Sequence, residues 1–145
     1  QENIVDMIGT YEIKLNEKGL ISIYFENYIY WYHAAHGMTV ARSITMDLCT
    51  GATYKFRDLF KPGSNYTARL NEIIKAQIAE REIPTIEPFE SIDTDQEYYL
   101  TPNALVIYYQ LYRYTPYAYG FLEFEIPYTE IADIINPQGP IAKLM

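Results

Sequence analysis

The first third of the chain alternates between apolar and polar residues, which predicts β-strands with one drier face. Residues 11–15 alternate, residues 20–32 form a longer run of the same kind, and residues 39–48 alternate again. Residues 16–19 and 49–51 have the composition of tight turns. The three segments therefore indicate an antiparallel meander.

The two faces of the segment 20–32 differ in chemistry, because successive side chains point to opposite sides of a strand. We predict that its odd-numbered positions, which are mostly large and apolar, face the core. The even-numbered positions form an amphipathic face in which tyrosine dominates. The odd positions are Ile21, Ile23, Phe25, Ile29 and Trp31, and the even ones are Ser22, Tyr24, Glu26, Tyr28, Tyr30 and Tyr32.

A single long helix is predicted in the middle of the chain, where apolar residues recur every three or four positions. These residues are Leu70, Ile73, Ile74 and Ile78. The helix should end near Glu82, because Pro84 disfavours helical backbone in the residue before it. Residues 105–114 and 121–126 are then expected to form further strands. Thr129 should begin a short C-terminal helix.

Together these elements predict an α+β fold. We expect one antiparallel meander, with the main amphipathic helix and the short C-terminal helix packed on one face of the sheet. The chain has 145 residues, of which 49% are hydrophobic and 21% charged, so residues 1–145 fit a single globular domain. No apolar run approaches the roughly 20 residues of a membrane-spanning helix.

The formal net charge of −8 restricts the class of partner. It argues against nucleic acid, whose phosphates would be repelled, and is compatible with a basic protein. Five acids and no base lie in the segment 84–97. That segment begins like a calcium loop at Asp93, but Tyr98 occupies the glycine position and Ala104 the final glutamate position. Two readings stay open: a solvated, flexible face, or a patch for a basic partner.

Few residues suggest catalysis or metal binding. His33 and His36 lie three residues apart in the loop after the tyrosine-rich strand, but a zinc site needs a third or fourth ligand. Cys49 is the only cysteine, so an internal disulfide cannot form, and no placed base would activate it. The motifs of serine hydrolases and of phosphate-binding loops are absent. We therefore expect no enzyme activity, no metal and no cofactor.

Several short motifs, taken in order, resemble the C-terminal domain of RsiV-type anti-sigma factors. Related domains occur beside peptidoglycan deacetylases and in bacterial lipoproteins. The resemblance covers nearly the whole chain. It is carried by the 20–23 strand, the 35–37 loop, residues 45–51, 58–60 and 98–101, the amphipathic helix, the 116–120 loop and residues 126–128.

The resemblance implies an extracytoplasmic domain tethered to a membrane, which in the anti-sigma members binds lysozyme. Binding exposes the protein to proteolysis and frees a sigma factor. No enzyme activity is implied for the domain itself. Because Gln1 is an unusual natural start, we expect the chain to come from a longer protein with a membrane anchor or a lipid anchor.

Three hypotheses about function follow. The first is a module that binds a protein such as a basic muramidase, through two loops that would supply His33, His36, Gly37, Pro116, Tyr117 and Tyr119. The second is a cell-wall glycan module, or an accessory domain of a peptidoglycan-modifying enzyme, in which Tyr24, Tyr28 and Tyr30 stack on sugar rings. The third is an enzyme, supported by the histidine pair alone. A purely structural role of both loops, in which Pro and Gly set turns, remains the alternative to a binding role.

Overall fold

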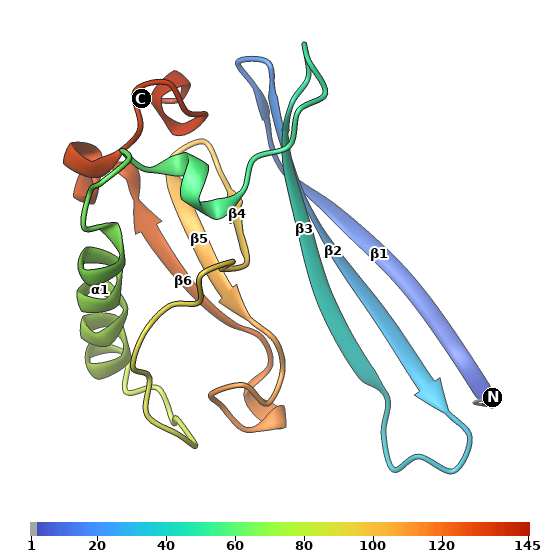
Figure 1. Cartoon of the computed structure of the whole chain (residues 1–145). Helices are drawn as coiled ribbons and strands as arrows, with labels where there is room; N and C mark the ends of the chain where they lie inside the picture. Colours follow the sequence, from blue (N-terminus) through green and yellow to red (C-terminus); the bar gives the residue numbers. More distant parts are fainter. Residues whose placement is uncertain (1–2) are drawn as a thin grey trace.

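The computed structural model describes residues 3–145 and contains two antiparallel sheets of three strands each (Figure 1). The first sheet has the order β1-β2-β3, with β1 at Ile4–Glu17, β2 at Leu20–Trp31 and β3 at Met38–Asp47. The second has the order β4-β5-β6, with β4 at Tyr98–Leu100, β5 at Ala104–Tyr109 and β6 at Leu122–Pro127. The α+β class and the antiparallel pairing are confirmed, with the strands divided between two sheets.

The predicted helix is α1, at Tyr66–Glu80, and it lies along the second sheet in Figure 1. Its side chains Leu70 and Ile74 are fully buried, as the periodicity required. They belong to the same core cluster as Leu105 on β5 and Phe124 on β6. The short C-terminal helix takes the form of tight 3₁₀ turns at Tyr128–Glu130 and Ala132–Ile134. No helix within residues 3–145 is long and apolar enough to cross a membrane.

The face of β2 that enters the core is the opposite of the predicted one. Leu20, Ser22 and Tyr24 are buried, whereas Phe25 on the other face is 39% exposed. The cause is the second sheet, which presents aromatic residues to the first. The Tyr24 ring meets Tyr108 edge-on at 5.3 Å between centroids and donates its hydroxyl to Glu26, so its polar tip is satisfied in the interior.

Hydrogen bonds join the two sheets where β2 and β3 cross β4. The buried Ser22 Oγ accepts the backbone N–H of Leu100 at 2.9 Å and lies 2.7 Å from Thr45 Oγ1. Ser43 Oγ lies 2.8 Å from the Tyr108 hydroxyl. Gln110 adds a pair of bonds to the backbone of Ala41, at 2.9 Å to its N–H and 2.7 Å to its carbonyl. The relative position of the sheets is therefore set by directed bonds as well as by packing.

We expect Ser22→Ala to lower the free energy of unfolding by about 1–3 kcal/mol, because it leaves the buried Leu100 N–H without an acceptor. Thr45→Val is the matched control, since it removes a hydroxyl from the same pair but leaves the Ser22–Leu100 bond in place. Urea unfolding of both variants measures the difference. A loss in Ser22→Ala no larger than the loss in Thr45→Val would contradict the assigned role.

Candidate functional site: an acidic groove beside β6

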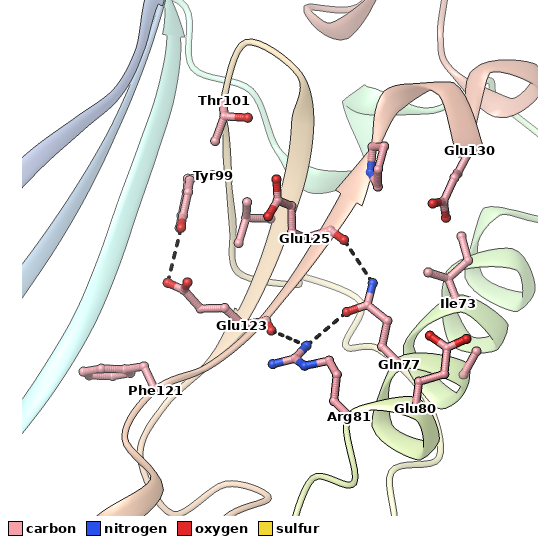
Figure 2. Close-up of a pocket in the computed structure, with 13 residues that line it drawn as sticks. Ile73, Gln77, Glu80, Arg81, Tyr99, Thr101, Phe121, Glu123, Glu125 and Glu130 are labelled. Carbon is pink, nitrogen blue, oxygen red and sulfur yellow. Dashed lines mark hydrogen bonds between the residues drawn. The ribbon is translucent and has the colours of Figure 1, made fainter.

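An open groove of about 940 Å³ lies between α1 and the edge of β6 and reaches β4 (Figure 2). Helix α1 supplies one wall, and the strands of the second sheet supply the floor and the other wall. The floor has aromatic surface from Tyr99 on β4 and Phe121, which immediately precedes β6. The other lining residues are Ile73, Ala76, Gln77, Glu80, Arg81, Thr101, Val106, Glu123, Glu125, Pro127 and Glu130.

Four carboxylates line this groove: Glu80 from α1, Glu123 and Glu125 from β6, and Glu130 from the following turn. None of the four takes part in a salt bridge within the described residues. The one cationic residue of the lining is Arg81. Carboxylates therefore outnumber cations here by four to one.

The guanidinium of Arg81 is already engaged. It donates one bond of 2.9 Å to the backbone carbonyl of Glu123 and one of 3.0 Å to Gln77 Oε1. Gln77 Nε2 in turn donates to the carbonyl of Glu125 at 2.9 Å. These bonds satisfy two carbonyls on the edge of β6, as sheet edges require, and they use the backbone oxygens of Glu123 and Glu125 rather than their carboxylates.

The Tyr99 hydroxyl fixes one carboxylate in place. It donates to Glu123 at 3.3 Å, as Figure 2 shows. Burial, reinforced by the charge of Glu123, raises the pKa of Tyr99 well above its usual range. The hydroxyl is therefore neutral and a donor at any physiological pH. On its other side, the Tyr99 ring faces the ammonium of Lys14 at 4.9 Å, and Lys14 is itself paired with Glu12 at 2.9 Å.

This combination of groups suits the recognition of positive charge. Exposed carboxylates attract Lys and Arg side chains, and the half-buried ring of Phe121 can accept a cation by cation–π contact. Tyr99 is only 5% exposed, and its ring already faces Lys14. Within residues 3–145, no cluster of three or more His, Cys, Asp or Glu side chains is placed to hold a metal ion. The sequence predicted a strand at 121–126, on which Glu123 and Glu125 lie, but no groove beside it. The groove forms where α1, which packs on the opposite face of the sheet, reaches the edge of β6, and no local pattern encodes that contact.

Part of the predicted loop site does come together. The rings of His36 and Tyr117 stack with their centroids 4.4 Å apart, and the Tyr117 hydroxyl donates to the carbonyl of Gly37 at 3.2 Å. Tyr112, which the sequence analysis did not single out, joins them with its hydroxyl 3.3 Å from His36 Nε2. Gly37 is closely packed, because a Cβ there would lie 2.2 Å from the ring of Tyr28.

The other predicted loop residues lie outside this cluster. The ring of His33 packs on Tyr32 at 4.0 Å rather than on His36. Pro116 is exposed and precedes a 3₁₀ turn at Tyr117–Tyr119, in which Tyr119 is 39% exposed. The turn leads directly to Phe121 at one end of the acidic groove. The loop residues are thus next to the groove along the chain.

The burial of side chains bears on two further expectations, one about Tyr24 and one about the acidic segment 84–97. Tyr24, proposed above to stack on sugar rings, is only 6% exposed and is closed off by the second sheet. The acidic segment 84–97 is anchored at several points, while its acids Glu87, Glu90 and Asp95 stay exposed. Phe89 and Ile92 are buried in the main core, and Asp93 makes bonds of 3.0 and 3.1 Å to the guanidinium of Arg113.

The fold and the groove define a small α+β domain with an open acidic groove. Its sequence matches the family described as "Protein of unknown function (DUF3298)" over residues 57–129, which is half of the chain. The chain belongs to this DUF3298 family. No curated protein matches it.

Two solved structures share the fold. A DUF3298 family member from Bacteroides fragilis superposes with a TM-score of 0.74 at 23% identity, covering 95% of this chain and 57% of that one. A DUF3298 family protein from Pseudomonas aeruginosa gives a TM-score of 0.68 at 23% identity, covering 94% and 63%. This chain therefore spans about three fifths of the length of these relatives.

Arg81→Met should lower the free energy of unfolding by about 1 kcal/mol, because the Glu123 carbonyl and Gln77 lose a charged donor. Lys75→Met, at an exposed position of the same helix, removes the same charge and serves as the control. Urea unfolding compares the two. Equal losses would show that the bonds to the β6 edge contribute nothing beyond net charge.

Proposed function

We propose that this chain is a non-catalytic binding domain for a basic protein, and that the acidic groove beside β6 is its principal contact. The observation that carries the proposal is the set of four carboxylates in an open groove whose single guanidinium is bonded to the protein's own backbone. A net charge of −8 would steer a basic partner toward it.

The groove offers a basic side chain two kinds of contact at once, one for its charged group and one for its aliphatic stem. A lysine or arginine that reaches between Glu123 and Glu125 gains charge-assisted hydrogen bonds. Its aliphatic stem then lies along Phe121, which is part of the same lining. The predicted loop site extends this surface, with Tyr117 and Tyr119 as further contacts next to Phe121 along the chain.

We further propose that the partner is a muramidase of the lysozyme type and that the domain works outside the cytoplasm, in a membrane-anchored protein or lipoprotein. The support is the resemblance to the lysozyme-binding domain of RsiV-type anti-sigma factors, together with the basic character of animal-type lysozyme. Any anti-sigma role would belong to the longer protein, because it requires a sigma-binding segment. The alternative function, as a cell-wall glycan module, is weakened by the burial of Tyr24.

Calorimetric titration with hen lysozyme tests the proposal. We expect saturable binding that weakens as salt is raised, because screening reduces attraction between exposed charges. The double variant Glu123→Gln/Glu125→Gln should weaken binding at least tenfold. Glu87→Gln/Glu90→Gln, which makes the same charge change at exposed positions of the 84–97 segment, should change it less than twofold. No binding, or equal effects of the two double variants, would refute the proposal. Capture by purified peptidoglycan instead would favour the glycan module.

The loop contribution has a separate test. Replacing Tyr117 and Tyr119 together with alanine should weaken lysozyme binding by more than tenfold, since aromatic anchors carry much of the energy of an interface. Leu48→Ala, at a position that is 53% exposed and outside both surfaces, is the control. Circular dichroism should show that all variants keep the fold. Unchanged affinity in the double variant would restrict the binding surface to the groove.

A further inference from the structure

Strand β1 is a long, apolar edge strand. Among the strands of the described chain it pairs with β2 alone, so the hydrogen-bonding groups along its outer edge are open over 14 residues. Most of its side chains are exposed. One face is largely apolar, whereas the other alternates Ile4 and Ile8 with Asp6, Thr10 and Glu12. The exposed fractions are 48% for Ile4, 57% for Val5, 55% for Met7, 49% for Ile8, 70% for Tyr11 and 50% for Ile13.

This edge lacks the features that usually prevent strands from adding to it. Proteins protect edge strands with proline, with outward lysines, with bulges or with a covering helix. There is no proline in β1, and its one lysine, Lys14, turns its ammonium to Glu12 and to the ring of Tyr99. Its two irregularities in pairing lie near its ends, which leaves residues 6–13 as an uninterrupted template. The edge of β6, by contrast, is bonded to α1 through Arg81.

The sequence of β1 is complementary to itself in one antiparallel register. In a two-fold pair the residues that face each other across the strands must lie on the same face of the sheet. With the axis at Thr10, Met7 of one copy faces Ile13 of the other. In the same way, Tyr11 of one copy lies opposite Gly9 of the other. On this face apolar side chains meet apolar side chains, and an aromatic ring covers the strand at its glycine. On the other face Ile8 of one copy lies opposite Glu12 of the other.

Charge selects this register over its neighbours. With the axis at Thr10, residues 7–13 of the two copies pair without interruption, and Asp6 faces no acid of the other copy. With the axis at Gly9, Asp6 would face Glu12 of the other copy, and symmetry would repeat this like-charge contact. An axis at Tyr11 would extend the paired residues into the irregularity between Ile13 and Leu15.

We propose that two copies of this chain associate through β1, edge to edge and antiparallel, with the two-fold axis at Thr10. The strand order across the dimer is β3-β2-β1-β1-β2-β3, which converts two open edges into one continuous sheet. The face of the first sheet that points away from the second sheet then lies on the same side of the continuous sheet in both copies. The interface is separate from the acidic groove, because no lining residue of the groove belongs to β1.

Sedimentation velocity across micromolar to submillimolar concentrations tests association and register together. Met7→Lys/Ile13→Lys places like charges opposite each other at two places, and should weaken the dimer by more than tenfold. Met7→Asp/Ile13→Lys is equally polar but places opposite charges there, and should restore the dimer. Both positions are at least half exposed, so the fold should tolerate the changes. A wild-type chain that stays monomeric, or two double variants that behave alike, would overturn the proposal.

Cross-linking tests the axis directly. In a Cys49→Ser background, Thr10→Cys places two thiols directly across the axis, within the Cα separation of roughly 4.5–5.5 Å found between paired strands. Mild oxidation should give a covalent dimer. Ile8→Cys is the control, because its two thiols would lie about 13 Å apart along the strands. Cross-linking at Ile8→Cys but not at Thr10→Cys would overturn the register.

Salt separates this proposal from the proposed function. Each copy carries a net charge of −8, so screening relieves repulsion between copies and should strengthen the dimer. The same change in salt should weaken lysozyme binding at the groove. Failure of either proposal therefore leaves the other intact and is recognised by its own salt dependence.

Discussion

The buried bond from the Leu100 N–H to Ser22 Oγ is the constraint on which the arrangement of this domain depends. A backbone donor enclosed between two sheets must have an acceptor, and a serine in the middle of β2 supplies it. Because Ser22 is on the even face of β2, Leu20 and Tyr24 on that face also turn toward the second sheet and are buried. The more apolar odd face is left half-buried or exposed, which is the reverse of what hydrophobicity alone predicts.

The docking of the sheets also places the acidic groove. It brings Tyr99 on β4 beside Tyr24 and fixes the side of the second sheet on which Glu123 lies. Helix α1 then closes the far edge, where Arg81 and Gln77 bond to carbonyls of β6. The helix thereby uses the only cation of the groove for a structural bond. The groove therefore has an excess of negative charge for two reasons. Four carboxylates line it, and its guanidinium is bonded to the edge of β6 rather than to one of them.

Periodicity in the sequence predicted the strands and α1, because the apolar residues on the buried face of a strand or helix recur at a fixed spacing. It could not say which face of β2 would be covered, since a tyrosine whose hydroxyl is bonded is buried as readily as isoleucine. The hydroxyl partner of Tyr24 is Glu26, only two residues away, but that of Tyr108 is Ser43 on another sheet. The groove likewise depends on α1 meeting β6, a contact between distant segments that no local pattern encodes.

The exposed strand β1 and the acidic groove occupy different parts of the surface, and this separation has a physical consequence. A dimer formed through β1 carries two grooves in a fixed relation. A partner that presents basic residues at several points, or that is concentrated at a surface, then binds the second groove at a raised effective concentration. Weak, salt-sensitive attraction at each groove would in that way become strong attachment without a larger interface at either site. The uncovered apolar edge and the unbalanced carboxylates, each unfavourable for an isolated domain, are thus consistent with a domain that acts in association.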